Sequence, residues 1–174
     1  QGGDVGAQID IYKRGLAAMP GSQELALLLG TAYERSGRID DAINAYEEIL
    51  AENPELPAVA NNLAALLADY RTDDASYERA LGLAIQFKDS DNAAFLDTLG
   101  WVYYRLGEYD EAVTYLKQSV DKAGQVPILR YHLGMAYMAA GDNDKAKAEL
   151  EAALEDPEID FTGVDEAKEA LAKL

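Results

Sequence analysis

Few side chains in this sequence could do chemistry together. His132 is the only histidine among 174 residues, and there is no cysteine. A catalytic set of Ser, His and Asp is compatible with this composition, because folding brings together residues that are far apart in the chain. However, His132 lies inside an expected helix, and no segment is typical of the strained turn that exposes a nucleophile. We therefore predict that the protein is not an enzyme.

Metal and cofactor sites are not indicated either. With a single histidine and no cysteine, the usual ligands of zinc cannot be assembled. Two acidic turns, Asp73-Asp74 and Asp142-Asn143-Asp144, resemble the start of a calcium loop, but neither continues into a calcium-binding loop that ends in Glu. Caps at the starts of helices explain these carboxylates better. The glycines stand singly, without the clustering that holds a phosphate, so we expect no cofactor and no metal.

The charge of the chain limits its partners. There are 32 acidic and 15 basic residues, which gives a net charge of −17. Nucleic acid and anionic lipid are recognised by clustered Lys and Arg, so neither is an expected partner. No apolar run approaches the length of a membrane span, so we expect no direct membrane insertion. The acidic surface is either a solubilising outer face or a surface that attracts basic partners.

A repeated pattern indicates which elements position this surface. Three segments contain Leu-Gly followed by Tyr, then a turn Gly and, five residues later, an Ala: Leu29-Gly30 with Gly37 and Ala42, Leu99-Gly100 with Gly107 and Ala112, and Leu133-Gly134 with Gly141 and Ala146. Gly100 and Gly134 are 34 residues apart, as are Gly30 and Ala64. Apolar residues recur at three- and four-residue spacing around each motif. This pattern predicts pairs of short helices that bury their apolar faces only by stacking on neighbouring pairs.

The repeat resembles the tetratricopeptide repeat (TPR) family. In that family the small residue of the first helix and the Ala of the second lie where the two helices approach closely. The resemblance implies an all-α fold, a right-handed α–α superhelix of antiparallel helix pairs. Residues 57–156 further resemble bacterial TPR proteins of the cell envelope and of exopolysaccharide export, through the segments Asp97–Trp101 and His132–Tyr137.

We expect one TPR array over residues 1–174. Residues 5–19 are interpreted as the second helix of a truncated repeat, so the natural protein is expected to continue upstream of Gln1. In the second repeat, a lengthened turn at 70–77 is expected to extend the helices. Thr162 is the expected N-cap of the last helix. The array comprises repeats at 23–56, 57–92, 93–126 and 127–160, and a C-terminal capping helix at 162–174.

In TPR proteins the first helices of the repeats line a concave groove that binds partners. We therefore predict a non-catalytic scaffold that binds a peptide or protein segment. The alternatives are a structural spacer within a longer TPR array and an accessory protein in envelope or polysaccharide export. The expected groove residues are Leu27, Thr31, Asn61, Asn62, Ala65, Asp69, Asp97, Trp101, Tyr104, Arg105, Tyr131, His132 and Met135.

Several of these groove residues have a second interpretation. Trp101 and Tyr104 are expected to anchor a partner, as aromatic residues often do, but they could also pack between neighbouring helices. His132 is expected to form a hydrogen bond between helices, with partner recognition as the alternative. Asn62 stands where many TPR grooves hold an Asn that binds a partner's backbone.

Compartment and oligomeric state are less constrained by the sequence. The absence of cysteine and the family resemblance favour a periplasmic or envelope location, with the cytoplasm as the alternative. An apolar face with Ile9, Ile11 or Leu16 on the N-terminal helix predicts weak homo-oligomerisation if it is exposed. If that face lies on the first repeat, a monomer is expected instead. The identity of the partner cannot be predicted from the sequence.

Overall fold

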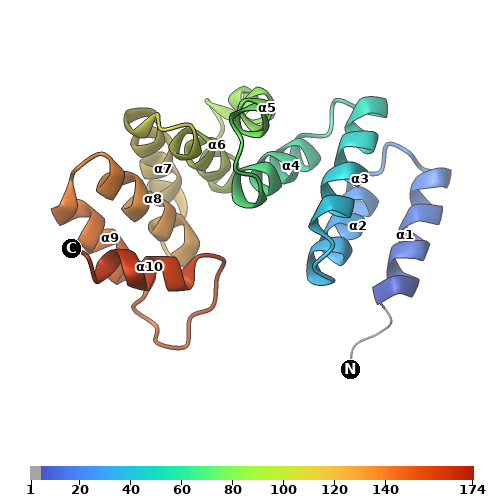
Figure 1. The fold of residues 1–174 in the computed structure, drawn as a ribbon. Coiled ribbons are helices and arrows are strands. Elements are labelled where there is room, and N and C mark those ends of the chain that lie inside the picture. Colours follow the sequence, from blue (N-terminus) through green and yellow to red (C-terminus); the bar gives the residue numbers. More distant parts are fainter. Residues whose placement is uncertain (1–4) are drawn as a thin grey trace. The chain divides into compact units, whose positions relative to one another are not determined.

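The protein is all-helical. The computed structural model describes residues 5–174, and these residues form ten α-helices and one 3₁₀ turn without any strand (Figure 1). The chain divides into two compact units, of which the first ends at Leu83 and the second covers Ala84–Leu174. The predicted all-α fold class is confirmed. Within the described range, no helix combines the length and apolarity that a membrane span needs.

The first unit is built from consecutive helices that pack on one another. Helix α1 contacts α2, α2 contacts α3, α3 contacts α4, and α2 also contacts α4. The helices are α1 (Val5–Ala18), α2 (Gln23–Arg35), α3 (Ile39–Glu52), α4 (Pro57–Tyr70) and most of α5 (Asp74–Ala84). The buried side chain of Ile9 lies in α1, whereas Ile11 is exposed.

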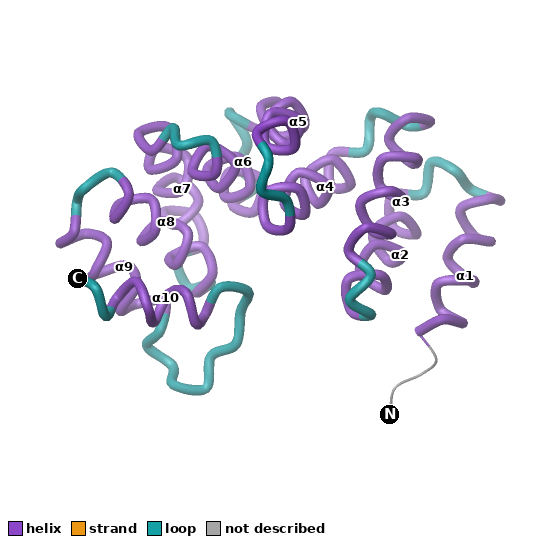
Figure 2. The backbone as a smooth tube through the Cα atoms, in the orientation of Figure 1, coloured by secondary structure: helices purple, strands orange, loops and turns teal. Residues whose placement is uncertain are grey.

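The second unit repeats this arrangement with two long helix pairs. Helix α6 packs on α7, α7 on α8, and α8 on α9, while α10 covers both α8 and α9. The elements are the 3₁₀ turn η1 (Ile85–Phe87) and the helices α6 (Ala93–Arg105), α7 (Tyr109–Ala123), α8 (Pro127–Ala139), α9 (Asn143–Ala153) and α10 (Val164–Leu171). Figure 2 shows the long loop between α9 and α10.

Local sequence signals explain where the helices begin and end. Pro57 and Pro127 occupy the first turns of α4 and α8, where a missing N–H costs nothing. The side chain of Ser22 caps α2 by accepting a hydrogen bond from the N–H of Leu25. The predicted turn glycines have positive φ angles, which glycine adopts without steric cost: 70° at Gly37, 81° at Gly107 and 86° at Gly141.

The helix pairs approach most closely at the small residues of their first helices. A Cβ atom added to Gly100 would lie 2.6 Å from Cγ of Leu116, and one added to Gly134 would lie 2.8 Å from Cγ of Leu150. A Cβ atom at Gly30 would collide with the ring of Tyr46. The nearest side chain therefore comes from the large residue one turn after the repeated Ala of the second helix. That Ala is fully buried in each pair, at Ala42, Ala112 and Ala146.

In the second repeat, most of the lengthened segment 70–77 extends the two helices, as predicted. Helix α4 ends at Tyr70 and α5 begins at Asp74, so the predicted long turn contains only residues 71–73. This is the same length as the other turns within pairs. The carboxylate of Asp73 accepts hydrogen bonds from both the N–H and the hydroxyl of Ser76, which explains why the chain becomes helical again so early.

The C-terminal helix also starts later than predicted. Thr162 is not its N-cap, because α10 begins at Val164 and its N-cap is Gly163. Gly163 has a φ angle of 98°, and a Cβ atom there would collide with the ring of Tyr131. The glycine is thus required both by the backbone conformation and by the close approach of the loop to α8.

Candidate functional site

Six of the predicted groove residues lie in the first unit, on the two helices that carry its expected inner surface. Helix α2 supplies Leu27 and Thr31, and α4 supplies the others. The contact between the helices is reinforced by a hydrogen bond from the N–H of Ala58 to Oε1 of Gln23 at 3.2 Å. We call this surface the α2–α4 face; its residues are Leu27, Thr31, Asn61, Asn62, Ala65 and Asp69.

Buried polar atoms without partners distinguish the α2–α4 face. Asn61 is only 7% exposed. Its Nδ2 donates to Oδ1 of Asn62 at 3.4 Å, but its own Oδ1 accepts no hydrogen bond from the described residues. The buried hydroxyl of Tyr46 likewise lacks a partner of acceptable geometry. Burial raises the pKa of Tyr46 to about 12, and the nearby amide of Asn62 opposes this shift.

Acidic side chains give the same unit a negative potential near these polar groups. Burial raises the pKa of Glu34 above its ordinary value, and the negative charge of Asp69 raises it further. Burial also raises the pKa of Tyr70, with smaller contributions from Asp69 and Glu34. The larger contribution, from burial, disfavours a charge of either sign, whereas the contributions from Asp69 and Glu34 reflect negative charges that lie near each other. These neighbouring carboxylates favour a ligand that brings hydrogen-bond donors.

The predicted groove residues of the second unit come from α6 and α8, which contact each other. A buried hydrogen bond joins the two helices. Nδ1 of His132 lies 3.0 Å from both carboxylate oxygens of Asp97, so the ring donates its Nδ1 hydrogen to this carboxylate. The expected hydrogen bond between helices at His132 is therefore present. Both side chains are almost fully covered, and their facing polar atoms are already hydrogen-bonded to each other.

Trp101 lies inside an aromatic stack. Its ring centroid is 4.5 Å from that of Tyr104 and 4.1 Å from that of His132, with interplanar angles of 7° and 15°. The ring of Tyr131 is tilted against it at 5.9 Å. Only 6% of Trp101 is exposed. Its geometry matches the alternative interpretation, packing between neighbouring helices, more closely than that of an accessible anchor.

The α9–α10 loop covers another predicted groove residue. Tyr131 is buried, and the ring of Phe161 lies 5.6 Å from its ring. Gly163 approaches the same ring closely enough to exclude a Cβ atom. Sequence reasoning missed Phe161, because this residue lies outside the repeated pattern. The predicted groove residues of this unit that retain partial exposure are Tyr104, Arg105 and Met135.

Metal ligands do not gather in the described part of either unit. Among the described residues, no group of three or more His, Asp or Glu side chains is arranged to hold a metal ion. The Asp97 and His132 pair is instead enclosed by the aromatic stack. The arrangement is suited to holding α6 against α8.

The repeats and their packing are those of a known family. Residues 3–70 and 103–158, more than half of the chain, match the family model described as Tetratricopeptide repeat. The chain belongs to the TPR family. TPR proteins are typically protein-interaction scaffolds and are generally non-catalytic. The match identifies the family as a whole and not the envelope or exopolysaccharide-export group within it.

Individual proteins extend this similarity. A TPR repeat-containing protein of Pseudomonas aeruginosa is 34% identical over 74 residues, which is 42% of this chain but only 12% of that protein. A thermophilic TPR protein of Thermus thermophilus has a TM-score of 0.72 at 24% identity. The similar region covers 97% of this chain and 91% of the Thermus chain. MamA of Desulfovibrio magneticus has a TM-score of 0.70 at 17% identity, covering 88% and 85%. These two structures share the fold.

Proposed function

We propose that this TPR protein is a scaffold that binds an extended segment of a partner protein, with the α2–α4 face as its main recognition surface. The observation that carries the proposal is the buried Oδ1 of Asn61, which has no hydrogen-bond donor among the described residues. A buried polar atom without a partner costs about 1–3 kcal/mol. A hydrogen-bond donor from a ligand removes this cost, so the same free energy contributes to binding.

Side-chain amides suit the recognition of an extended peptide. Each peptide unit offers one N–H donor and one C=O acceptor, and an Asn side chain offers the complementary groups. Asn61 and Asn62 are adjacent, and Asn62 is only partly buried. Oδ1 of Asn61 is buried, so it accepts from a peptide N–H once its side chain has turned towards the partner, while the amide of Asn62 donates to a carbonyl. The small side chain of Ala65 leaves room for the peptide backbone one turn further along α4.

Charge then favours one kind of segment. The carboxylates of Glu34 and Asp69 lie close enough to repel each other, so a carboxylate-rich peptide would add to this repulsion. A segment with Lys, Arg or uncharged donors next to its backbone contacts would be favoured. In the second unit, the partly exposed Tyr104 and Met135 offer an adaptable apolar contact of their own.

The test begins with selecting peptides from a random display library on the intact chain. The affinities of the selected peptides are then measured by calorimetry for Asn61→Ala, Asn62→Ala and the control Glu151→Ala, which changes an exposed residue of α9. We expect both Asn variants to bind at least tenfold more weakly and the control to bind normally.

Stability supplies the second readout of this experiment. Asn61→Ala removes an unpaired buried acceptor, so it should leave the melting temperature unchanged or raise it. Weaker binding with undiminished stability is what a recognition residue produces. If the selected peptides bind all three variants as tightly as the original chain, the α2–α4 face is not the site. Failure to select any peptide would favour a structural spacer.

A further inference from the structure

A concave surface lies in the first unit, between α1 and α3. It is a cavity of about 700 Å³ whose floor is α2. Its apolar part is formed by Leu16 and Ala17 of α1, Leu29 of α2, and Ala45 and Ile49 of α3. We call it the α1–α3 groove. A volume of this size is typical of binding clefts.

The α1–α3 groove is separate from the α2–α4 face. Leu29 and Tyr33 of α2 line the groove, whereas Leu27 and Thr31 belong to the α2–α4 face. Residues two positions apart in a helix are rotated by roughly 200°, so these pairs point to opposite sides of α2. A partner could therefore occupy one surface without touching the other.

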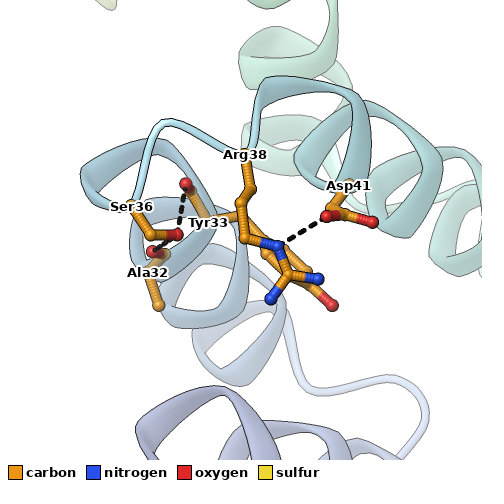
Figure 3. Close-up of polar contacts among 5 residues, drawn as sticks. All are labelled: Ala32, Tyr33, Ser36, Arg38 and Asp41. Carbon is orange, nitrogen blue, oxygen red and sulfur yellow. Dashed lines mark hydrogen bonds and ion pairs between the residues drawn. The ribbon is translucent and has the colours of Figure 1, made fainter. Parts of the chain in front are cut away.

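At one end of the groove, acidic and basic side chains of the same unit neutralise each other. The guanidinium of Arg38 lies 4.8 Å from the centroid of the Tyr33 ring, and its Nε donates to Asp41 at 2.6 Å (Figure 3). The ammonium of Lys13 lies 5.6 Å from the same ring. Figure 3 also shows the Ser36 hydroxyl, which bonds to the carbonyls of Ala32 and Tyr33 and closes the end of α2.

The other end of the groove carries uncompensated negative charge. Glu48 and Glu52 line it from α3, and neither takes part in any ion pair found among the described residues. They are one helical turn apart and both are exposed. Their side chains are therefore available to a positively charged group, unlike Asp41, which Arg38 already neutralises.

The backbone adds to this negative end. Lys13 of α1 lies near Tyr33, while Pro20 beyond its C-terminus accepts a hydrogen bond from Nδ2 of Asn53 at 3.1 Å. Helices α1 and α3 thus run in the same direction, and both C-termini lie at the end with Glu52. Because a helix C-terminus carries a partial negative charge, both helix dipoles reinforce the two carboxylates.

We propose that the α1–α3 groove binds an amphipathic helix of a partner protein, with Lys or Arg side chains in its N-terminal turn facing Glu48 and Glu52. The lining of α3 extends from Asp41 to Glu52, which corresponds to roughly 17 Å or three helical turns. An apolar stripe of that length on the partner covers Leu16, Leu29 and Ile49. A helix antiparallel to α1 and α3 also places its positive N-terminus at the negative end.

A second copy of this chain does not fit the groove as well. The net charge of −17 makes two copies repel each other. Nucleic acid is disfavoured for the same reason. The apolar lining with acidic side chains at one end is complementary to a basic amphipathic helix. This type of partner therefore fits the groove best.

The test uses three lactam-bridged, fluorescently labelled helical peptides of about 11 residues, because unconstrained helices of this length are marginal in water. Each has the same Leu stripe. The first carries Lys in its N-terminal turn, the second carries Lys in its C-terminal turn, and the third carries Glu in its N-terminal turn. Binding to the intact chain is measured by fluorescence polarisation. We expect the first peptide to bind at least tenfold more tightly than the third and several-fold more tightly than the second.

Two groups of variants assign the binding to the groove. Ala45→Trp fills the cavity and should weaken binding of the first peptide at least tenfold, whereas Ala148→Trp, on an exposed position of α9, should not change it. The double variant Glu48→Gln, Glu52→Gln should weaken binding about threefold to tenfold. The matched control Glu151→Gln, Glu155→Gln changes the net charge equally and should bind normally.

Circular dichroism establishes that each variant is folded, and Leu16→Asn, which makes the apolar lining polar without adding charge, replaces Ala45→Trp if the latter is not. The proposal is overturned if the groove variants and their controls bind alike, because the peptide then follows only the overall charge. It is also overturned if the three peptides bind equally or if the first does not bind at all. Asn62→Ala should have no effect, which separates this result from the test of the α2–α4 face.

Discussion

The substitution Gly100→Ala measures how closely α6 and α7 approach. A Cβ atom at this position would lie 2.6 Å from Cγ and 2.9 Å from the backbone nitrogen of Leu116. Carbon atoms are optimally separated by roughly 3.5–4.0 Å, so the helices must move apart. A rotation of the Leu116 side chain relieves only the first contact, because the nitrogen belongs to the backbone. Overpacking of this kind costs about 1–3 kcal/mol.

The intrinsic preference of the helix opposes this cost. Alanine is favoured over glycine inside a helix by about 0.8–1 kcal/mol. We therefore expect Gly100→Ala to lower the free energy of unfolding by a net of about 0.5–2 kcal/mol. Gly82→Ala is the matched control, because Gly82 lies in α5 and its added Cβ would meet no atom within 4 Å. That variant should be stabilised, so the difference between the two isolates the collision.

Urea unfolding provides the assay. TPR arrays can unfold repeat by repeat, so circular dichroism is combined with the fluorescence of Trp101, which is the only tryptophan and reports on α6. A double-mutant cycle with Leu116→Ala tests the assigned contact, and Gly100→Ala should cost less in that background. If Gly100→Ala is as stable as Gly82→Ala, or its cost is unchanged by Leu116→Ala, the proposed packing of α6 on α7 is refuted.

Three further predictions concern buried groups. Because burial raises the pKa of Tyr46 to about 12 from an ordinary value near 10, its contribution to stability is fully present below pH 10 and is lost as the pH rises towards 12. Denaturant unfolding between these pH values should show a loss of about 2–3 kcal/mol that is absent in Tyr46→Phe. The pKa of Glu34 is raised by burial and by Asp69, so its charged form disfavours folding. We expect Glu34→Gln to raise the melting temperature near neutral pH. This gain should vanish as the pH falls through the ordinary carboxyl pKa, because Glu34 is then neutral in the folded and unfolded states. Trp101→Ala should destabilise the fold by about 3–5 kcal/mol in thermal unfolding, and an unchanged melting temperature would contradict the stacked arrangement.

The helix pairs and their turns could be predicted because their determinants are local and repeated. A residue that ends a helix with a positive φ angle is nearly always Gly, and Gly37, Gly107 and Gly141 recur at the same place in each pair. The close approach at Gly100 and Gly134 follows from the same 34-residue period. The second repeat lacks the turn Gly, and its helix start at Asp74 is marked instead by the hydrogen bonds from Ser76 to Asp73.

The exposure of the candidate site could not be predicted in the same way. The repeat indicates which face of α6 or α8 a residue lies on, but not which other segment covers that face. Tyr131 is covered by Phe161 and Gly163, from a loop that has no counterpart in the repeats. Trp101 is covered by Tyr104 and His132, and the latter is fixed by Asp97. Burial there results from long-range contacts that have no local signature.

This difference changes how a recognition residue is identified. Trp101 has the side chain most often found at the centre of interfaces, yet both of its faces already contact rings of the same chain. Asn61 is a less conspicuous residue, but its buried Oδ1 lacks a donor among the described residues. A partner gains little by approaching a side chain whose contacts are complete, and gains about 1–3 kcal/mol by pairing an atom that folding left unpaired. Within this repeat architecture, an unsatisfied polar group on an inner helix is therefore better evidence for a binding site than the presence of an aromatic side chain.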